Sequence, residues 1–175
     1  MPSLKIRRLL AIFSIMISLV LLLSGCGGTP EKRDYFKIGV ITSLSGPESY
    51  GGSVTKRGYE LWADTVNKNG GIKVGDKSYP VQLVYADDQS DPTAGADAAQ
   101  RMITSENVDF ILGPYTSGVT MAVAPILEKY KVPMITGSAE SPLIWKQKFR
   151  YTFGTIPAVD LTGSTPIATL AKDTK

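Results

Sequence analysis

The chain has 175 residues, with 19 lysines and arginines, 16 aspartates and glutamates, a single cysteine and no histidine. Three cations, Lys5, Arg7 and Arg8, precede the first acidic residue, Glu31, and without them the basic and acidic residues balance. The chain after these three cations has no net charge, so electrostatics gives no support for a nucleic-acid partner. The lack of histidine excludes zinc sites of the Cys/His type, and Cys-His or Ser-His-Asp catalytic groups, within this sequence.

Residues 1–25 show the order of segments that is typical of a secretory signal peptide. Basic residues come first, an uncharged apolar run occupies residues 9–23, and small residues follow. The run has about 15 residues, which is shorter than the roughly 20 needed to cross a bilayer. We therefore predict export, with an uncleaved signal anchor and an incidental cysteine as the alternative interpretation.

The segment LSGC, residues 23–26, resembles a bacterial lipobox. The resemblance implies cleavage before Cys26 and attachment of lipid to this residue, which is the sole cysteine. Residues 26–35 are then expected to form a flexible, lipid-anchored tether. The protein is accordingly expected at the membrane through its lipid anchor, facing the periplasm or the cell exterior, and without a disulfide.

From residue 36 onward, predicted strands and helices alternate along the chain. A short apolar run predicts a strand at residues 36–42, and apolar spacings of three and four predict a helix from Ser53 to the stop signal at residues 67–71. A hairpin turning at Gly75–Asp76 and a strand at residues 80–86 come next. Further along, the pattern predicts a helix at residues 92–106, a strand at 108–112, a helix at 119–130, a strand at 132–136, a short helix at 141–147, an extended segment at 150–156 and a helix from residue 160 onward.

Local signals support two of these helices, and their order indicates the fold. Asp91 is a favourable N-cap and Pro92 a favourable first helical residue. Pro125 either kinks the helix at 119–130 or marks its true first turn. Strands and helices that alternate with short connections predict an α/β fold with a doubly wound parallel sheet. Ligands of such sheets bind beyond the carboxyl ends of the strands. The loops expected to meet there are residues 43–52, 87–91, 113–118, 136–141 and 154–160.

The loop at 113–118 places Thr116 and Ser117 directly before a helix. The first backbone N–H groups of a helix have no internal partner, and together with the helix dipole they suit an anion such as a carboxylate. The two hydroxyl groups add further donors. A helix cap without any ligand is the alternative interpretation.

Two other loops supply candidate ligand contacts. In the loop at 136–141, Ser138 and Ala139 are small and leave room for a ligand beside the backbone of Gly137. Glu140 either receives an ammonium group or is a surface charge near a helix start. In the first loop, Tyr50 either covers an apolar part of the ligand or is a partly buried loop tyrosine.

Other chemistry finds little support in the sequence. The segment DDQSDP, residues 87–92, lacks the residue order of a calcium loop, and no glycine-rich nucleotide-binding motif occurs. Ser117 does not lie in a nucleophile elbow, because the residue two positions before it is Tyr115. We therefore expect no metal, no cofactor and no enzymatic activity.

Five segments follow one another in a specific order and spacing: KIGVITSLSGPESYGG, NKNGGI, DDQSDP, ILGPYTSGVTMAVAPILEKYKVPMIT and YTFGTIP. This set closely resembles the amino-terminal lobe of the leucine/isoleucine/valine-type periplasmic binding proteins, the solute receptors of branched-chain amino-acid ABC importers. The resemblance covers residue 36 to the end of the chain. It implies two α/β lobes that close around a ligand.

The resemblance also implies roles for the loop residues. Ser117 matches a serine that binds the amino-acid carboxylate, Ser138 matches a residue whose carbonyl takes the ammonium, and Tyr50 matches a tyrosine of the side-chain pocket. Glu140 stands where the family often has a threonine that grips the carboxylate. A carboxylate there repels the ligand's own unless Glu140 faces the ammonium or is protonated, or unless Ser141 takes the threonine's role. A cationic or amide ligand therefore stays open.

Residues 36–175 correspond to about one lobe and stop near the end of a predicted helix, so we expect a chain truncated before the second lobe. The leading hypothesis is a monomeric, lipid-anchored receptor that binds an amino acid, of the branched-chain type or related, and delivers it to ABC permease subunits. The alternatives are an extracytoplasmic sensor of amino acids or amides with the same fold and, with less support, an α/β hydrolase.

Overall fold

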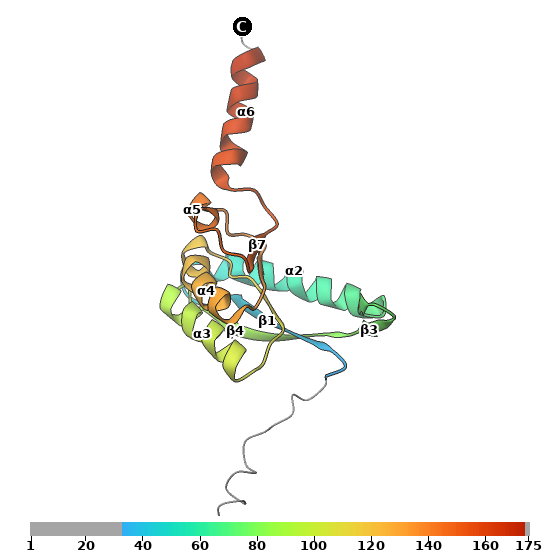
Figure 1. The fold of residues 1–175 in the computed structure, drawn as a ribbon. Coiled ribbons are helices and arrows are strands. Elements are labelled where there is room, and N and C mark those ends of the chain that lie inside the picture. The colour runs from blue at the N-terminus through green and yellow to red at the C-terminus, as the bar shows by residue number, and fades with distance from the viewer. Residues whose placement is uncertain (1–32, 174–175) are drawn as a thin grey trace, which may run out of the picture. The chain divides into compact units, whose positions relative to one another are not determined.

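The computed structural model describes residues 33–173, so the predictions for residues 1–25, for Cys26 and for most of the tether lie outside the described residues. Five parallel strands form the main sheet in the order β4-β1-β5-β6-β7 (Figure 1). These strands are β1 (Phe36–Thr42), β4 (Val81–Asp87), β5 (Phe110–Leu112), β6 (Met134–Thr136) and β7 (Thr152–Gly154).

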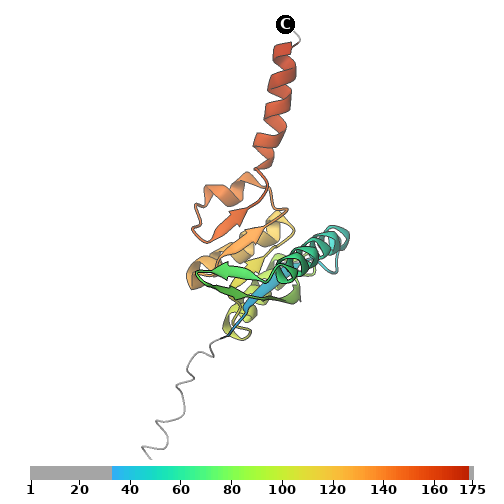
Figure 2. The same ribbon diagram turned by 90° about the vertical axis from the view of Figure 1, so that its right-hand side faces the viewer.

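Helices cover both faces of this sheet. Helix α2 packs against β1 and β4 on one face, and α3 and α4 pack together on the other (Figures 1 and 2). A separate antiparallel hairpin connects α2 to β4. The helices within residues 33–173 are α2 (Ser49–Lys68), α3 (Pro92–Thr104), α4 (Ser117–Tyr130), α5 (Pro142–Lys146) and α6 (Val159–Asp173), and the hairpin strands are β2 (Ile72–Val74) and β3 (Lys77–Tyr79).

Alternate residues of the parallel strands enter two different buried clusters, one on each face of the sheet. Ile41 of β1 packs in a cluster with Leu127 of α4, whereas Ile38 of the same strand packs in a second cluster with Ala63 of α2. Burial on both faces explains why β1 forms an apolar run in the sequence, whereas Ile135 of β6 and Phe153 of β7 are exposed. The predicted α/β fold with a doubly wound parallel sheet is therefore confirmed.

Of the two predictions made from local helix signals, the one for Asp91 is confirmed and one interpretation of Pro125 is wrong. Asp91 is the N-cap of α3, and its side chain accepts a hydrogen bond from the Ala94 amide at 2.8 Å, as predicted. Helix α4 runs from Ser117 to Tyr130 with Pro125 inside it, so the interpretation of Pro125 as the first turn is wrong.

Helix α2 begins at Ser49, four residues before the predicted start at Ser53. The intervening glycines have low helix propensity, but close packing favours them here. A Cβ atom on Gly52 would lie 1.9 Å from the carbonyl oxygen of Ser43. Tyr50 consequently lies in the first turn of a helix, and its predicted placement in a loop is wrong.

Helix α6 exposes several apolar side chains. Leu161, Ile167 and Leu170 are each at least 60% exposed. Polar residues are interspersed among them, and none of the helices within residues 33–173 combines the length and the apolar character needed to cross a membrane.

Candidate functional site

Four loops follow the carboxyl ends of neighbouring strands at one edge of the sheet. Residues 43–48 follow β1 and residues 88–91 follow β4, and we call these two segments the first loop pair. Residues 113–117, which end in the first residue of α4, follow β5, and residues 137–141 follow β6. We call the latter two segments the second loop pair.

The polar side chains of the first loop pair bind each other's segments. Ser43 Oγ donates to Asp88 Oδ1 at 2.6 Å, and Ser45 Oγ donates to Asp87 Oδ2, at the end of β4, also at 2.6 Å. Ser90 Oγ donates to the Ser45 carbonyl oxygen at 2.9 Å. These groups are therefore used to hold the two loops together.

The two acids beside these serines have pKa values shifted in opposite directions. Asp88 is fully buried, and burial raises its pKa more than the hydrogen bonds from Ser43 and Ser90 lower it. Its Oδ2 atom has no hydrogen-bond partner within residues 33–173. Burial also acts to raise the pKa of Asp87, but the Ser45 hydroxyl and three backbone amides outweigh burial and lower this pKa. Relative to a free aspartate, the surroundings favour the neutral form of Asp88 and the charged form of Asp87.

Two hydroxyl groups connect the halves of the second loop pair. Ser117 Oγ accepts a hydrogen bond from the Ser141 amide at 3.1 Å. Thr136, the last residue of β6, donates from Oγ1 to the Pro114 carbonyl oxygen at 2.9 Å and accepts from the Ala139 amide at 3.0 Å. Because the Ser117 oxygen is the acceptor here, its own hydroxyl proton can be donated to a ligand.

The start of α4 offers donors at the second loop pair. Thr116 is the N-cap, and its side chain accepts a hydrogen bond from the Val119 amide at 3.2 Å. Ser117 is the first helical residue, so the prediction that it precedes the helix is wrong by one position. Within residues 33–173, the backbone amides of Ser117 and Gly118 make no hydrogen bond. Unpaired amides at the positive end of a helix dipole suit an anion.

The remaining predicted residues lie in different surroundings. Ala139 is fully buried and Ser138 is half-buried. The side chain of Glu140 is exposed, and its carbonyl oxygen accepts a hydrogen bond from the Val159 amide at 2.9 Å. Tyr50 is 84% exposed on α2. The structure therefore gathers every predicted ligand contact except Tyr50 into the second loop pair.

Sequence reasoning did not assign a site role to Tyr115, which lies within this loop pair, or to Tyr59 of α2, which lies close to it. The Tyr115 ring packs against Gly51, where a Cβ atom would lie 2.2 Å from the tyrosine hydroxyl oxygen. The Tyr59 hydroxyl lies 3.3 Å from the position of a Cβ on Gly137, and it has no hydrogen-bond partner within residues 33–173. Burial raises the pKa of Tyr59 more than the nearby amides of Gly137 and Gly113 lower it. Tyr115 adjoins Thr116 in the sequence, which is a usable signal, but no local pattern distinguishes Tyr59.

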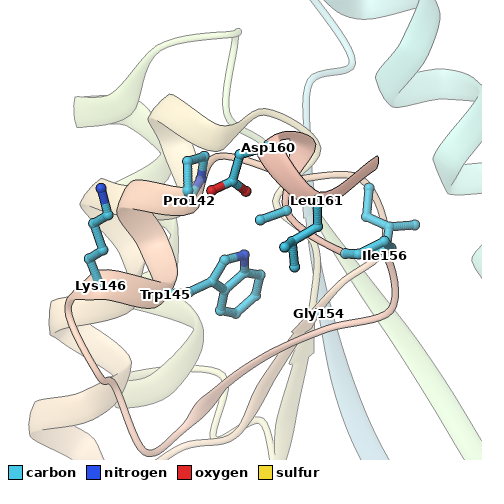
Figure 3. A pocket seen from close by; sticks show the side chains of 9 residues that line it. Pro142, Trp145, Lys146, Gly154, Ile156, Asp160 and Leu161 are labelled. Carbon is cyan, nitrogen blue, oxygen red and sulfur yellow. The ribbon is translucent and has the colours of Figure 1, made fainter. Parts of the chain in front are cut away.

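A separate hollow of about 530 Å³ lies between α5, β7 and the start of α6 (Figure 3). Trp145, Ile156 and Leu161 line it, and the Trp145 indole packs against Gly154. A binding site needs a few convergent polar groups to orient its ligand, and the second loop pair supplies them whereas the walls of the hollow are mainly apolar. We therefore place the candidate site at the second loop pair. No cluster of three metal-ligating side chains occurs within residues 33–173.

Comparison with protein families and with known sequences places this geometry in context. A family model described as periplasmic binding protein matches residues 36–175. A Leu/Ile/Val-binding protein from Rhizobium johnstonii is 37% identical over 110 residues, which cover 63% of this chain and 29% of the relative. The chain spans about a third of the length of such relatives.

Solved structures share the arrangement of strands and helices. The branched-chain amino acid transporter substrate binding protein LivJ from Streptococcus pneumoniae, in complex with isoleucine, is 27% identical, with a TM-score of 0.66 over 71% of this chain and 34% of that protein. A solute binding protein of an ABC transporter from R. palustris, in complex with 4-hydroxybenzoate, is 34% identical, with a TM-score of 0.58 over 71% of this chain and 32% of that one. Both bound molecules carry a carboxylate.

Proposed function

Because the chain belongs to the periplasmic binding protein family, we propose that it forms the first lobe of an extracytoplasmic solute receptor for an ABC importer. In this role the lobe binds one side of a small carboxylate-bearing solute, an amino acid of the branched-chain type or a related compound. A second lobe closes over the solute, and the closed form docks on permease subunits. The protein acts as a monomer and does no covalent chemistry.

The observation that carries the proposal is the pair of unpaired backbone amides at the start of α4. The amides of Ser117 and Gly118 have no partner within residues 33–173, and the positive end of the helix dipole adds to their attraction for a carboxylate. The Ser117 hydroxyl accepts from Ser141 and keeps its own proton for the same carboxylate. The carboxylates of isoleucine and 4-hydroxybenzoate in the two solved structures support this assignment.

The other predicted residues serve the rest of the solute in this proposal. The Ser138 carbonyl accepts from the ammonium group, and the exposed carboxylate of Glu140 adds negative charge on the same side. Ala139 keeps the loop small, and Thr116 fixes the start of α4 through its cap. Tyr50, exposed on α2, covers the apolar part of the solute.

The same proposal covers where the protein is located and what contacts the exposed apolar side chains of α6. Export through the signal at residues 1–25 and lipid attachment at Cys26 hold the receptor at the membrane, facing the periplasm or the cell exterior. The exposed apolar side chains of α6, including Ile167 and Leu170, support a second lobe that covers them in the complete receptor.

The proposal is tested with Ser117→Ala in the complete receptor. We expect the affinity for the bound solute to fall by about 1–3 kcal/mol, because a hydroxyl donor to a charged carboxylate is lost. Isothermal titration calorimetry with L-leucine and with 4-hydroxybenzoate measures this change and shows which of the two solutes the parent protein binds. A thermal melt of the ligand-free variant separates binding from any loss of stability through the Ser141 contact.

Ser138→Ala is the matched control, because the proposal uses the carbonyl of that residue and leaves its hydroxyl without a role. The control variant is expected to bind the solute as the parent does. Unchanged affinity in Ser117→Ala, or equal losses in both variants, contradicts the assignment of the Ser117 hydroxyl to the carboxylate.

A further inference from the structure

The buried hydroxyl of Thr136 contacts both segments of the second loop pair. Its oxygen donates to the carbonyl of Pro114 at 2.9 Å and accepts from the amides of Ala139 at 3.0 Å and Ser138 at 3.4 Å. Thr136 itself is 0% exposed, so no water competes for these bonds. A single buried side chain therefore contacts two loops that follow different strands, in addition to the bond between Ser117 and Ser141.

These bonds also determine which way the peptide groups of the loop at 137–141 face. In a trans peptide the C=O and N–H groups point in opposite directions, and the peptide bonds of this loop are trans. Because the Ala139 amide points inward at Thr136, the carbonyl of Ser138 points away from the buried hydroxyl. The same reasoning turns the carbonyl of Gly137 outward, because the Ser138 amide faces Thr136.

The other segment receives the opposite polarity from the same hydroxyl. The carbonyl of Pro114 points at Thr136, so the amide of Tyr115 in that peptide points away from it. One segment thus directs carbonyl acceptors away from Thr136, and the other directs the Tyr115 amide away from it, close in sequence to the unpaired amides of Ser117 and Gly118.

We propose that Thr136 is a positioning residue that gives the two segments opposite polarity, so that the site selects a zwitterionic solute. Its hydroxyl holds the carbonyls of Gly137 and Ser138 where an ammonium group binds, beside the donors that bind the carboxylate. Thr136 is buried and does not touch the solute. The inference rests on the proposed function for the identity of the solute, but the orientation of the loops can be tested without any ligand.

The first test compares two solutes on Thr136→Val in the complete receptor. The probes are L-leucine and 4-methylpentanoate, which is leucine without its amino group. We expect the variant to bind leucine about tenfold more weakly, because the carbonyls that meet the ammonium lose their orientation. Binding of 4-methylpentanoate is expected to change by less than about twofold, because the Thr116 cap still fixes the start of α4. Equal weakening of both probes indicates a purely structural role and overturns the proposal.

The neighbouring strand supplies a matched control. Thr152 of β7 is 6% exposed, and its hydroxyl has no hydrogen-bond partner within residues 33–173. Thr152→Val therefore removes a buried hydroxyl without breaking a loop contact, and it is expected to leave the ratio of the two affinities unchanged. Thr136→Ser retains the hydroxyl and is expected to restore the parent ratio. Failure of this serine variant to restore it also contradicts the proposal.

The second test needs no solute and uses backbone amide hydrogen exchange in the ligand-free receptor. Exchange at Ser138 and Ala139 is expected to become at least about tenfold faster in Thr136→Val and to stay unchanged in Thr152→Val. Unchanged exchange at these two amides overturns the assignment of Thr136. If the parent protein binds neither leucine nor 4-methylpentanoate, the proposed amino-acid function is contradicted, whereas the exchange experiment still decides the role of Thr136.

Discussion

The two loop pairs lie at the same edge of the sheet but use their polar groups differently. In the first loop pair, serine side chains of one segment bond to an acid or a carbonyl of the other, which leaves few donors for anything else. In the second loop pair, the buried hydroxyl of Thr136 bonds to both segments, while the amides of Ser117 and Gly118 stay unpaired. The difference indicates that the first pair fastens the fold and that the second keeps polar groups open for a solute.

The largest expected effect comes from changing the backbone that shapes the second loop pair. Gly113 has a φ angle of +93°, and a Cβ atom there would lie 2.0 Å from the carbonyl oxygen of Ile41 in β1. Gly113→Ala is expected to destabilise the protein by about 3 kcal/mol, because neither the dihedral angle nor the adjacent backbone accommodates a methyl group. Urea denaturation followed by circular dichroism measures the loss.

Gly118→Ala is the control for this substitution in the same region. A Cβ atom on Gly118 would meet no atom within 4 Å, and the residue lies inside α4. Alanine there is expected to leave the protein equally stable or to stabilise it by about 0.5 kcal/mol, since it favours the helix more than glycine does. A Gly113→Ala protein as stable as this control would show that the second loop pair is not held by its backbone.

The next effect uses pH to distinguish two neighbouring acids, Asp87 at the end of β4 and Asp88 in the first loop pair. Asp87 has a lowered pKa, so its contribution to stability is present above the unfolded-state value of about 4 and is lost as pH falls through the lower folded-state pKa. Asp88 has a raised pKa, so its contribution is complete below about pH 4 and is lost as pH rises through the raised value. Asp87→Asn is therefore expected to cost about 1 kcal/mol at neutral pH, whereas Asp88→Asn is expected to stabilise by a similar amount.

Denaturation midpoints measured from pH 3 to pH 8 test both substitutions together. The loss of stability in Asp87→Asn and the gain of stability in Asp88→Asn, each relative to the parent protein, should shrink toward the acidic end of this range. If the denaturation midpoints of the two variants changed with pH in the same way, both acids would experience the same environment. This result would contradict the opposite directions of the two pKa shifts.

The sequence was sufficient to predict those features of the fold and of the loop pairs that depend on residues close together in the chain. The cap at Asp91, the alternating strands and helices, and the placement of Thr116 and Ser138 in loops that follow strands all follow from neighbouring residues. The start of α2 was missed because packing of Gly52 against Ser43, and not helix propensity, decides it. The Thr136 hydroxyl reaches Pro114 across 22 residues of chain, and no local pattern indicates such a contact. The contact by which Thr136 orients the two segments of the second loop pair was therefore beyond sequence reasoning.

The smallest expected effect concerns the Tyr59 hydroxyl beneath the second loop pair. The hydroxyl is neutral, since burial raises its pKa, and it has no partner within residues 33–173. Tyr59→Phe keeps the ring and removes an unpaired buried group, so the free energy of unfolding is expected to stay within about 0.5 kcal/mol of the parent value. Urea denaturation of Tyr59→Phe beside Thr136→Val measures the contrast between an unpaired and a paired hydroxyl on the same loops. A loss above about 1 kcal/mol in Tyr59→Phe would show that this hydroxyl fastens the loops, as the serines do in the first loop pair. The second loop pair would then no longer differ from the first in how it is held.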